Sequence, residues 1–345
     1  MTGKSGSMRK NRRPEPVAQG LRIPSDGKVL LVGYKAADLS ADILREGVTC
    51  HVLDIYHQHA IEKVFPGATV VCSPRLPEGS CDLVLFRTGP KLMSGELALD
   101  LLQEIRSLKP VRFELDYVGR ERDRNELLDK VRDSPDRVRN FRATWQASVP
   151  GGEKLTFASY PGCFCHRRLD EGGLALAEVV TRQILDGVVL PSKNGRLRIL
   201  DMGCGCGLVG LLIAARLKAA DAAALVSSVD LVMVDSHTRA VEAARENARQ
   251  LGVDAKVYLA DDGLASAPET EPFDVFVGNP PYYSDYRIAE VFLDTARRTL
   301  KPDGVCYTVV KNAANLQPVQ ERYFPAVEVL PRRNYAVLKS PACGR

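Results

Sequence analysis

The sequence has no uninterrupted run of about 18 apolar residues, the length that a helix needs to cross a bilayer. Its first twenty residues also lack the apolar centre of a secretory signal. We therefore expect neither a membrane span nor an exported protein, but a cytoplasmic one. Apolar residues still make up 45% of the 345 residues, enough for two cores of ordinary size, so two domains are the first expectation.

A regular cysteine framework is also lacking, although nine cysteines are present. A chain of this length needs no disulfides, so we interpret them as reduced thiols. Cys163, Cys165 and His166 form a C-x-C-H cluster that resembles half of a metal site. The nearest other pair, Cys204 and Cys206, lies inside a glycine-rich loop with a different role, so we expect no metal.

Net charge is close to zero outside the N-terminal tail. The chain carries +4, and residues 1–20 supply all of it, because five basic residues there face the single acid Glu15. A strongly basic protein that coats nucleic acid is thereby excluded, and contacts must come from local patches and the tail. We interpret residues 1–20 as a disordered basic tail, with a solubilising leader and an RNA-gripping arm as equal alternatives.

The order of strands and helices occurs twice in the chain. The first copy is expected to contain a strand at 29–33, a helix near 37–45, strands at 48–54 and 81–86, and a helix at 96–107. The second is expected to contain a strand at 198–201, helices at 208–217 and 237–250, and strands at 231–235, 256–260 and 273–277. Short β-rich runs that alternate with helices predict a parallel sheet covered on both faces.

Two pairs of aspartates mark equivalent positions of the copies. Asp54 matches Asp235 and Asp82 matches Asp274, at separations of 181 and 192 residues. We infer an α/β fold of two Rossmann-like domains in tandem, a duplication that has diverged. The domains are expected at 21–149 and 150–345, with the linker at 150–152.

The two copies are not equivalent in their loops. The first has only Gly33 where the second has a glycine-rich loop, so we interpret the N-terminal copy as degenerate and the C-terminal one as catalytic. Between them, residues 118–142 alternate basic and acidic side chains. A solvated helix is the favoured interpretation of this segment, and an RNA-facing patch is the alternative.

A glycine-rich loop follows the strand at 198–201 and begins a helix. Its candidate residues are Asp201, Gly203, Gly205 and Gly207. The glycines allow a tight turn and a close approach to a ligand, and the helix N-terminus adds amide donors. Such a loop alone would equally suit a dinucleotide, so it does not identify the ligand.

Acidic residues end the next two strands of the second copy. Asp235 fits an adenosine ribose, because one carboxylate accepts from both hydroxyls, and it is equally suited to cap the helix at His237. Asp261 and Asp262 follow, where a carboxylate can receive an adenine amino group. We choose Asp262, although a D-D-G sequence also favours a plain tight turn.

The sequence N-P-P-Y directly follows the strand at 273–277, as Asn279, Pro280, Pro281 and Tyr282. Ligands of open parallel sheets bind beyond the carboxyl ends of strands, so this loop belongs beside the glycine loop. The Asn279 side-chain oxygen and the Pro280 carbonyl can accept from an amino group and make its lone pair available. Tyr282 can stack on a base.

The glycine loop, Asp235 and N-P-P-Y together resemble class I methyltransferases that act on exocyclic or amide nitrogens with S-adenosylmethionine, and the resemblance covers about residues 195–340. Residues 160–164 (Y-P-G-C-F) and 169–172 (L-D-E-G) are similar to the P-G-x-F and L-D-x-G segments of bacterial ribosomal RNA guanine-N2 methyltransferases, those of the small-subunit methyltransferase C type and their large-subunit relative. That family also carries a degenerate N-terminal copy of the fold.

The resemblance implies further roles. Asp170 and Gly172 would lie near the methionine end of the cofactor, and Phe164 would shape the pocket. The expected reaction is methyl transfer to N2 of a guanine in ribosomal RNA, with 16S preferred over 23S. Ribosomal RNA or a ribosomal subunit is the expected partner, the N-terminal copy holding RNA or shielding the core, and a monomer is expected.

Alternatives to this function remain open at the level of sequence. The first keeps the fold and cofactor but methylates adenine N6 or a protein glutamine amide, because each presents an N–H group of similar geometry. The second is a non-catalytic RNA-binding assembly factor. Cys165, where the family usually has serine, is a departure that weakens the assignment of a particular ribosomal site.

Overall fold

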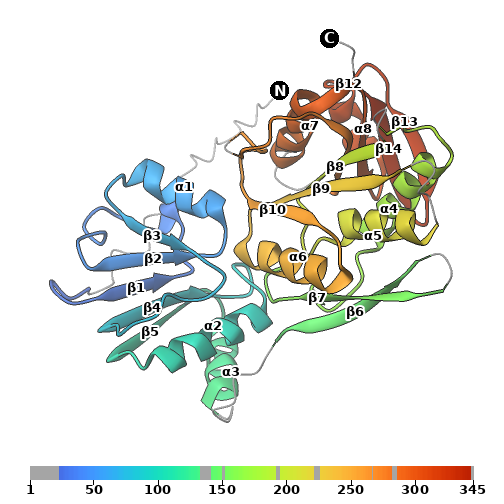
Figure 1. The fold of residues 1–345 in the computed structure, drawn as a ribbon. Coiled ribbons are helices and arrows are strands. Elements are labelled where there is room, and N and C mark those ends of the chain that lie inside the picture. Colours follow the sequence, from blue (N-terminus) through green and yellow to red (C-terminus); the bar gives the residue numbers. More distant parts are fainter. Residues whose placement is uncertain are drawn as a thin grey trace, which may run out of the picture.

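The computed structural model describes residues 23–132, 141–149, 152–191, 195–220, 226–265, 267–281 and 286–342. The expected tail at 1–20 and Tyr282 lie outside these residues. Two α/β units stand side by side, each built on its own sheet (Figure 1).

The N-terminal unit is a parallel sheet of five strands in the order β3-β2-β1-β4-β5. The strands are β1 (Val29–Val32), β2 (Val48–Val52), β3 (Thr69–Cys72), β4 (Leu83–Thr88) and β5 (Arg112–Tyr117). One face packs on α1 (Ile55–Val64), and the other on α2 (Gly95–Leu108) and α3 (Glu121–Arg132). Strands β1 and β4 are buried along their whole length, which accounts for the continuous apolar sequences of β1 and of residues 83–86 in β4.

The C-terminal unit is a sheet of seven strands in the order β10-β9-β8-β11-β12-β14-β13. The strands are β8 (Arg196–Met202), β9 (Ser228–Asp235), β10 (Ala255–Leu259), β11 (Phe273–Gly278), β12 (Leu300–Val310), β13 (Glu328–Arg332) and β14 (Tyr335–Pro341). One core contains α4 (Glu171–Leu185), α5 (Leu208–Ala219) and α6 (Thr238–Leu251). The opposite core contains α7 (Arg287–Thr299) and α8 (Ala313–Gln320).

The duplication is visible in the strand order and in one repeated hydrogen bond. Strands β3-β2-β1-β4-β5 take the same order as β10-β9-β8-β11-β12. Asp82 accepts from the amide of Lys28 at 2.7 Å, and Asp274 accepts from the amide of Arg198 at 2.7 Å. In both units the carboxylate at the start of the fourth strand thus anchors the central strand. The expectation of two related α/β domains in tandem is confirmed.

One expected helix of the first copy does not form. Residues 37–45 contain only the end of a three-residue 3-10 helix (Ala36–Asp38), whereas the equivalent segment of the second copy is α5. The Asp38 carboxylate accepts from the Lys35 amide and pairs with Arg87, so it closes the turn at its start. The backbone leaves the helical conformation at Leu39, which is extended with φ −106° and ψ 157°.

The segment at 150–152, expected as the linker, falls in the sequence between two strands that pair with each other, and residues 150 and 151 lie outside the described part of the chain. Strands β6 (Ala143–Ser148) and β7 (Lys154–Ser159) are antiparallel, and Trp145 stacks on Phe157 with ring centroids 4.9 Å apart. Phe157 is buried in the core shared with α4, α5 and α6. We propose that the domain boundary lies between α3 and β6, because β6 packs with the C-terminal unit.

The two units meet through reciprocal backbone hydrogen bonds. The Ile55 amide donates to the Ser236 carbonyl at 2.9 Å, and the Thr238 amide donates to the Leu53 carbonyl at 2.7 Å. Leu53 and Ser236 follow β2 and β9, which are equivalent strands of the two sheets. The contact therefore has the self-complementary form of an interface between two copies of one domain.

Candidate functional site

The turn after β11 lies directly beside the glycine loop. Strands β8 and β11 are neighbours and parallel, with Gly278 opposite Met202. A Cβ added to Gly203 would lie 2.6 Å from the Phe292 ring, and one added to Gly278 would lie 2.9 Å from the same ring. Both turns therefore pack against one aromatic side chain of α7, at the edge where the sequence placed them.

Asn279 is held by Asp170. The Asn279 Nδ2 donates to Asp170 Oδ2 at 2.9 Å, while Asp170 Oδ1 accepts from the Gly172 amide at 3.0 Å and caps α4. A carboxylate only accepts, so the amide group of Asn279 must turn its NH2 toward Asp170. The side-chain oxygen Oδ1 is then left for another donor.

Burial raises the pKa of Asp170, while its bonds to the Gly173 and Gly172 amides and to Asn279 oppose this rise. Space around this carboxylate is tight, because a Cβ added to Gly173 would lie 2.6 Å from Asp170 Oδ2. A glycine at position 173 therefore leaves the room that the Asp170 carboxylate needs to contact Asn279.

The glycine loop adopts backbone conformations that favour glycine. Gly203, Gly205 and Gly207 have φ angles of 66°, 56° and 85°. Gly205 faces open space, since a Cβ there would meet nothing within 4 Å. The loop therefore offers a side on which a ligand can approach the backbone.

Asp201 lies beneath this loop and not on its open side. It is 1% exposed, and its Oδ2 accepts from the Gly210 amide in α5 at 2.8 Å. Burial raises the pKa of Asp201 to about 7. The geometry is that of a brace between β8 and α5, so Asp201 reaches a ligand only through the loop that it positions.

Asp235 bonds both the glycine loop and the residue before α6. Its Oδ2 accepts from the Gly205 amide at 2.9 Å, and its Oδ1 accepts from the His237 amide at 2.9 Å. The N-cap of α6 is His237, so Asp235 binds the residue before the helix and does not cap the helix itself. Burial raises the pKa of Asp235 to about 6.

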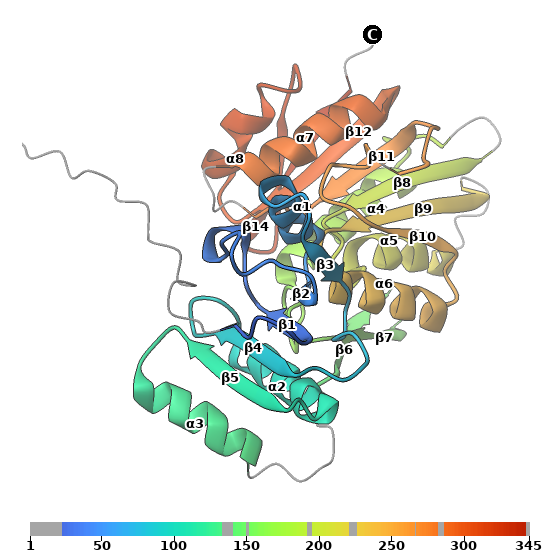
Figure 2. The same ribbon diagram turned by 90° about the vertical axis from the view of Figure 1, so that its left-hand side faces the viewer.

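The two acids after β10 have different surroundings. The Asp261 Oδ1 lies 2.9 Å from the His59 Nδ1, so this carboxylate faces α1 of the N-terminal unit. Asp262 is half-buried beside it. Figure 2 shows α1 in front of the C-terminal sheet, in agreement with this contact. Sequence reasoning missed His59, because its partner is about two hundred residues away.

Phe164 and its loop lie between the two units. Phe164 is 65% exposed, whereas the preceding Cys163 is buried. The Pro161 carbonyl accepts from Arg239, and Arg167 pairs with Glu96 of α2 at 2.7 Å. The exposed aromatic ring thus sits on a loop that the N-terminal unit helps to hold.

Arg239 is a buried cation at this interface, and several acceptors converge on it. It is 2% exposed and donates to Asp100 and Glu104 of α2, at 2.5 and 3.1 Å. It also donates to the Pro74 carbonyl at 3.0 Å. Sequence reasoning missed Arg239 as well, because an arginine in the first turn of a helix has no distinctive pattern.

The cysteines near the glycine loop are buried thiols. Burial raises the pKa of Cys163 to about 12, and it also raises the pKa values of Cys204 and Cys206. Within the described ranges, no group of three or more His, Cys, Asp or Glu side chains is arranged to hold a metal ion. Among the same residues, no helix is long and apolar enough to cross a membrane.

The model of the methyltransferase small domain family matches residues 154–339, which is more than half of the chain. The chain belongs to this family. The matched range begins with β7 and includes the glycine loop, the L-D-E-G segment and Asn279. The expected identity as a methyltransferase is thereby confirmed for the C-terminal unit.

Two relatives of this methyltransferase carry the same description. A protein of Stutzerimonas stutzeri, described as ribosomal RNA small subunit methyltransferase C, is 29% identical over 89% of this chain and 92% of its own. A protein of Hahella chejuensis with the same description is 36% identical over 49% of this chain and 44% of its own.

A solved structure shares the fold of the whole methyltransferase. The 16S rRNA N2 methyltransferase of T. thermophilus, solved with AdoMet and guanosine, has a TM-score of 0.74. It is 17% identical and covers 93% of this chain and 90% of its own. The similarity extends across both units, which confirms the tandem class I methyltransferase fold.

Proposed function

We propose that this methyltransferase transfers the methyl group of S-adenosylmethionine to the exocyclic N2 of a guanine in ribosomal RNA, and that the RNA is 16S. The observation that carries the proposal is the hydrogen bond from Asn279 Nδ2 to Asp170. It leaves Asn279 Oδ1 as an acceptor for one N–H of an amino group.

Acceptor groups of the chain can make the substrate amino group a better nucleophile. An exocyclic amino group is a poor nucleophile, because its lone pair is delocalised into the purine ring. Acceptors at Asn279 Oδ1 and the Pro280 carbonyl favour a pyramidal nitrogen and stabilise the positive charge that develops on it. S-adenosylmethionine supplies an electrophilic methyl group on a sulfonium. The N–C bond forms as the C–S bond breaks, and the nitrogen then loses one proton to solvent.

The cofactor is assigned to the open side of the glycine loop. Gly205 has room there for a close ligand, and Gly203 and Gly207 hold the turn. Asp235 is proposed for the ribose, Asp262 for the adenine amino group, and Asp170 with Gly172 for the methionine end. Asp201 is assigned a positioning role, because its carboxylate is buried under the loop. Tyr282 is proposed to stack on the target base.

The relatives supply the choice of substrate. Proteins that match over nearly the whole chain are described as ribosomal RNA small subunit methyltransferase C. We therefore propose ribosomal RNA or the small ribosomal subunit as the partner and the cytoplasm as the location. Methylation of adenine N6 or of a glutamine amide is treated as an outcome of the test, because the same acceptors would serve those nitrogens.

The test is substitution of Asn279 by alanine. The loss of one acceptor aimed at the reacting nitrogen is expected to lower kcat by about a hundredfold or more. Cofactor affinity, measured by calorimetry, should change little, because Asp170 and the glycine loop remain. Asn315→Ala, an exposed asparagine on α8, is the matched control.

The product identifies the substrate. Mass mapping of 16S ribosomal RNA from cells without the gene should show one missing N2-methylguanosine, restored by the wild-type protein and not by Asn279→Ala. Unchanged methyl transfer by the variant would overturn the role of Asn279. A missing N6-methyladenosine or methylglutamine would overturn the substrate and keep the reaction.

A further inference from the structure

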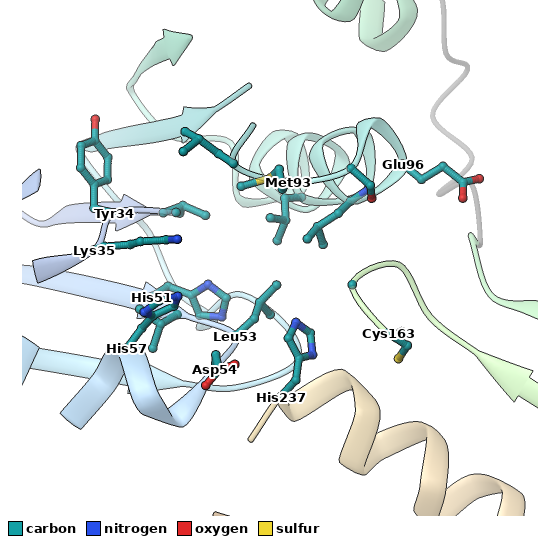
Figure 3. Close-up of a pocket in the computed structure, with 18 of the residues that line it drawn as sticks. Tyr34, Lys35, His51, Leu53, Asp54, His57, Met93, Glu96, Cys163 and His237 are labelled. Carbon is teal, nitrogen blue, oxygen red and sulfur yellow. The ribbon is translucent and has the colours of Figure 1, made fainter. Parts of the chain in front are cut away.

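A cavity of about 490 Å³ lies between the N-terminal sheet and the loops of the C-terminal unit (Figure 3). Small-molecule sites are typically about 300 to 1,000 Å³, so its size suits a ligand of nucleotide dimensions. Gly33 and Asp54 of the N-terminal unit line it, and Gly162, Cys163 and His237 close it from the other side. None of these residues is assigned to the methyl-transfer site.

The cavity occupies the ligand position of the degenerate copy. It lies at the carboxyl ends of β1 and β2, next to the point where the strand order reverses between β1 and β4. Open α/β sheets bind ligands at this point. The C-terminal unit has its glycine loop and Asp235 at the equivalent position. The N-terminal copy therefore lacks the glycine loop but retains a cavity at the equivalent position.

The walls of the cavity differ in chemistry. One wall is apolar and includes Val32, Met93, Leu97 and Leu101. The other carries imidazoles, and Figure 3 shows His51, His57 and His237 gathered on this side. An apolar wall facing hydrogen-bonding groups suits a flat heterocycle, which is apolar on its faces and polar at its edge.

The imidazoles are neutral in the folded protein. Burial lowers the pKa of His51 and of His237 to about 4 and also lowers that of His57. A neutral imidazole offers one donor and one acceptor. The His51 Nε2 is already bonded to the Ser73 carbonyl at 2.9 Å. The His237 Nδ1 is buried and has no hydrogen-bond partner among the described residues.

Charged groups divide between the interior and the opening. Asp54 accepts from the Tyr56 amide and from Ser236, and Glu96 pairs with Arg167, so both carboxylates are occupied. Lys35 lies at the opening and directs its side chain toward the cavity in Figure 3. Lys35 therefore supplies a positive charge at the rim, where a phosphate would be placed.

We propose that this cavity binds a nucleoside monophosphate unit, with the base between the apolar wall and the imidazoles and the phosphate at Lys35. This second site is separate from the proposed methyl-transfer site and does not depend on catalysis. The same chemistry occurs in a free mononucleotide and in an unpaired nucleotide of an RNA chain, and the experiment separates these two sources.

The experiment uses the full chain with ¹³C-labelled histidine and adenosine 5′-monophosphate as the probe. S-adenosylhomocysteine is present at saturation, so that the probe cannot occupy the cofactor position. Four of the five histidines line the cavity, and His59 lies outside it, so His59 is an internal control. The His57 and His237 signals should shift with a Kd of about 1 mM or lower, while the His59 signal stays in place.

Two variants and two controls localise the binding. His57→Leu and Lys35→Met should each weaken binding by about tenfold, a loss equivalent to about 1.4 kcal/mol. The matched controls are His59→Leu and Lys63→Met. They replace a histidine and a lysine of α1 that do not line the cavity. Thermal unfolding of each variant checks that the fold is retained.

Each outcome decides the proposal. Displacement of the probe by a short unpaired oligoadenylate assigns the site to RNA, whereas binding of the mononucleotide without such competition assigns it to a free nucleotide. No shift at about 1 mM probe, or the same shifts with inorganic phosphate alone, overturns the proposal. Equal weakening by the controls also overturns it. Methyl transfer is measured separately, so failure here leaves the proposed function untouched.

Discussion

At the scale of the residue, Asp170 joins the end of one helix to the acceptor group of the site. Its two oxygens accept from Gly172 and Asn279, so the ionised carboxylate sets the orientation of the Asn279 amide. Burial raises the pKa of Asp170, and protonation removes one acceptor. We therefore predict that activity falls as the pH drops through this raised pKa.

The variant Asp170→Asn tests this dependence. It should lower kcat by about tenfold or more and remove the acid limb of the rate profile, because the group that titrates is gone. Asp186→Asn, an exposed change at the other end of α4, is the control and should leave the profile unchanged. Persistence of the same acid limb in Asp170→Asn would contradict the assignment.

Asp201 gives a prediction on stability. Its folded-state pKa of about 7 lies above the ordinary value, so the folded protein binds more protons than the unfolded chain between about pH 4 and 7. The contribution of Asp201 to stability is full below pH 4 and is lost as pH rises through 7. Each pH unit between the two pKa values corresponds to about 1.4 kcal/mol.

In Asp201→Asn this loss should be absent, because the amide oxygen can still accept from Gly210 and carries no charge. Denaturant unfolding of both proteins at pH 5 and pH 8 is the measurement. A variant that loses as much stability between these two pH values as the wild type would show that Asp201 is not the group responsible.

The positions of the motif residues at the strand ends were predictable from the sequence. Their contacts were predictable only in part. The glycines, Asp235 and Asn279 lie at the strand ends where the sequence placed them. Asp201, a candidate for direct cofactor binding, lies buried under the loop, because its neighbours in space belong to α5. His59 has a partner that no local pattern indicates.

At the scale of the element, α6 connects the two units through Arg239. Its guanidinium pairs with Asp100 and Glu104 of α2, and all three groups are mostly removed from water. Removing one member of a buried ion pair is costly, because the remaining charges stay buried without a partner.

We predict that Arg239→Met lowers the free energy of unfolding by about 2 to 4 kcal/mol, somewhat less than for a fully buried pair because the two acids are partly exposed. Arg249→Met, at an exposed position of the same helix, should change it by less than about 0.5 kcal/mol. Equal effects of the two substitutions would show that the ion pairs of Arg239 do not contribute to stability as predicted.

Elements with strong periodicity were predicted to within a few residues. The helix expected at 237–250 is α6 at 238–251, and that expected at 96–107 is α2 at 95–108. The segment at 37–45 does not form the predicted helix, because the backbone becomes extended at Leu39. The P-G-G sequence at 150–152, predicted as a linker, falls between the paired strands β6 and β7, and glycine and proline favour a turn and a linker alike.

At the scale of the whole molecule, all five histidines lie at or near the seam between the units. The pKa values of His51 and His237 are lowered to about 4, below the ordinary 6.5, because burial disfavours the charged imidazole. The unfolded chain then binds more protons between pH 6.5 and 4. Stability from these groups is present above pH 6.5 and is lost as pH falls toward 4.

We predict that His51→Gln reduces the loss of stability between pH 7 and pH 5 by about 1 to 2 kcal/mol relative to the wild type. Urea unfolding at the two pH values gives the comparison. Asn315→Gln, an exposed change on α8 that removes no titratable group, serves as the control and should leave the loss unchanged. An identical loss in His51→Gln and the wild type would exclude His51 as a contributor.

The reciprocal bonds between Ile55 and Ser236 and between Thr238 and Leu53 involve main-chain atoms alone. Such bonds make almost no demand on amino-acid identity, so they persist when the side chains at these four positions change. Proline is the exception, because it lacks the amide hydrogen that positions 55 and 238 must donate. After a gene duplication, two domains can therefore lose their sequence similarity while the backbone hydrogen bonds of their interface are retained.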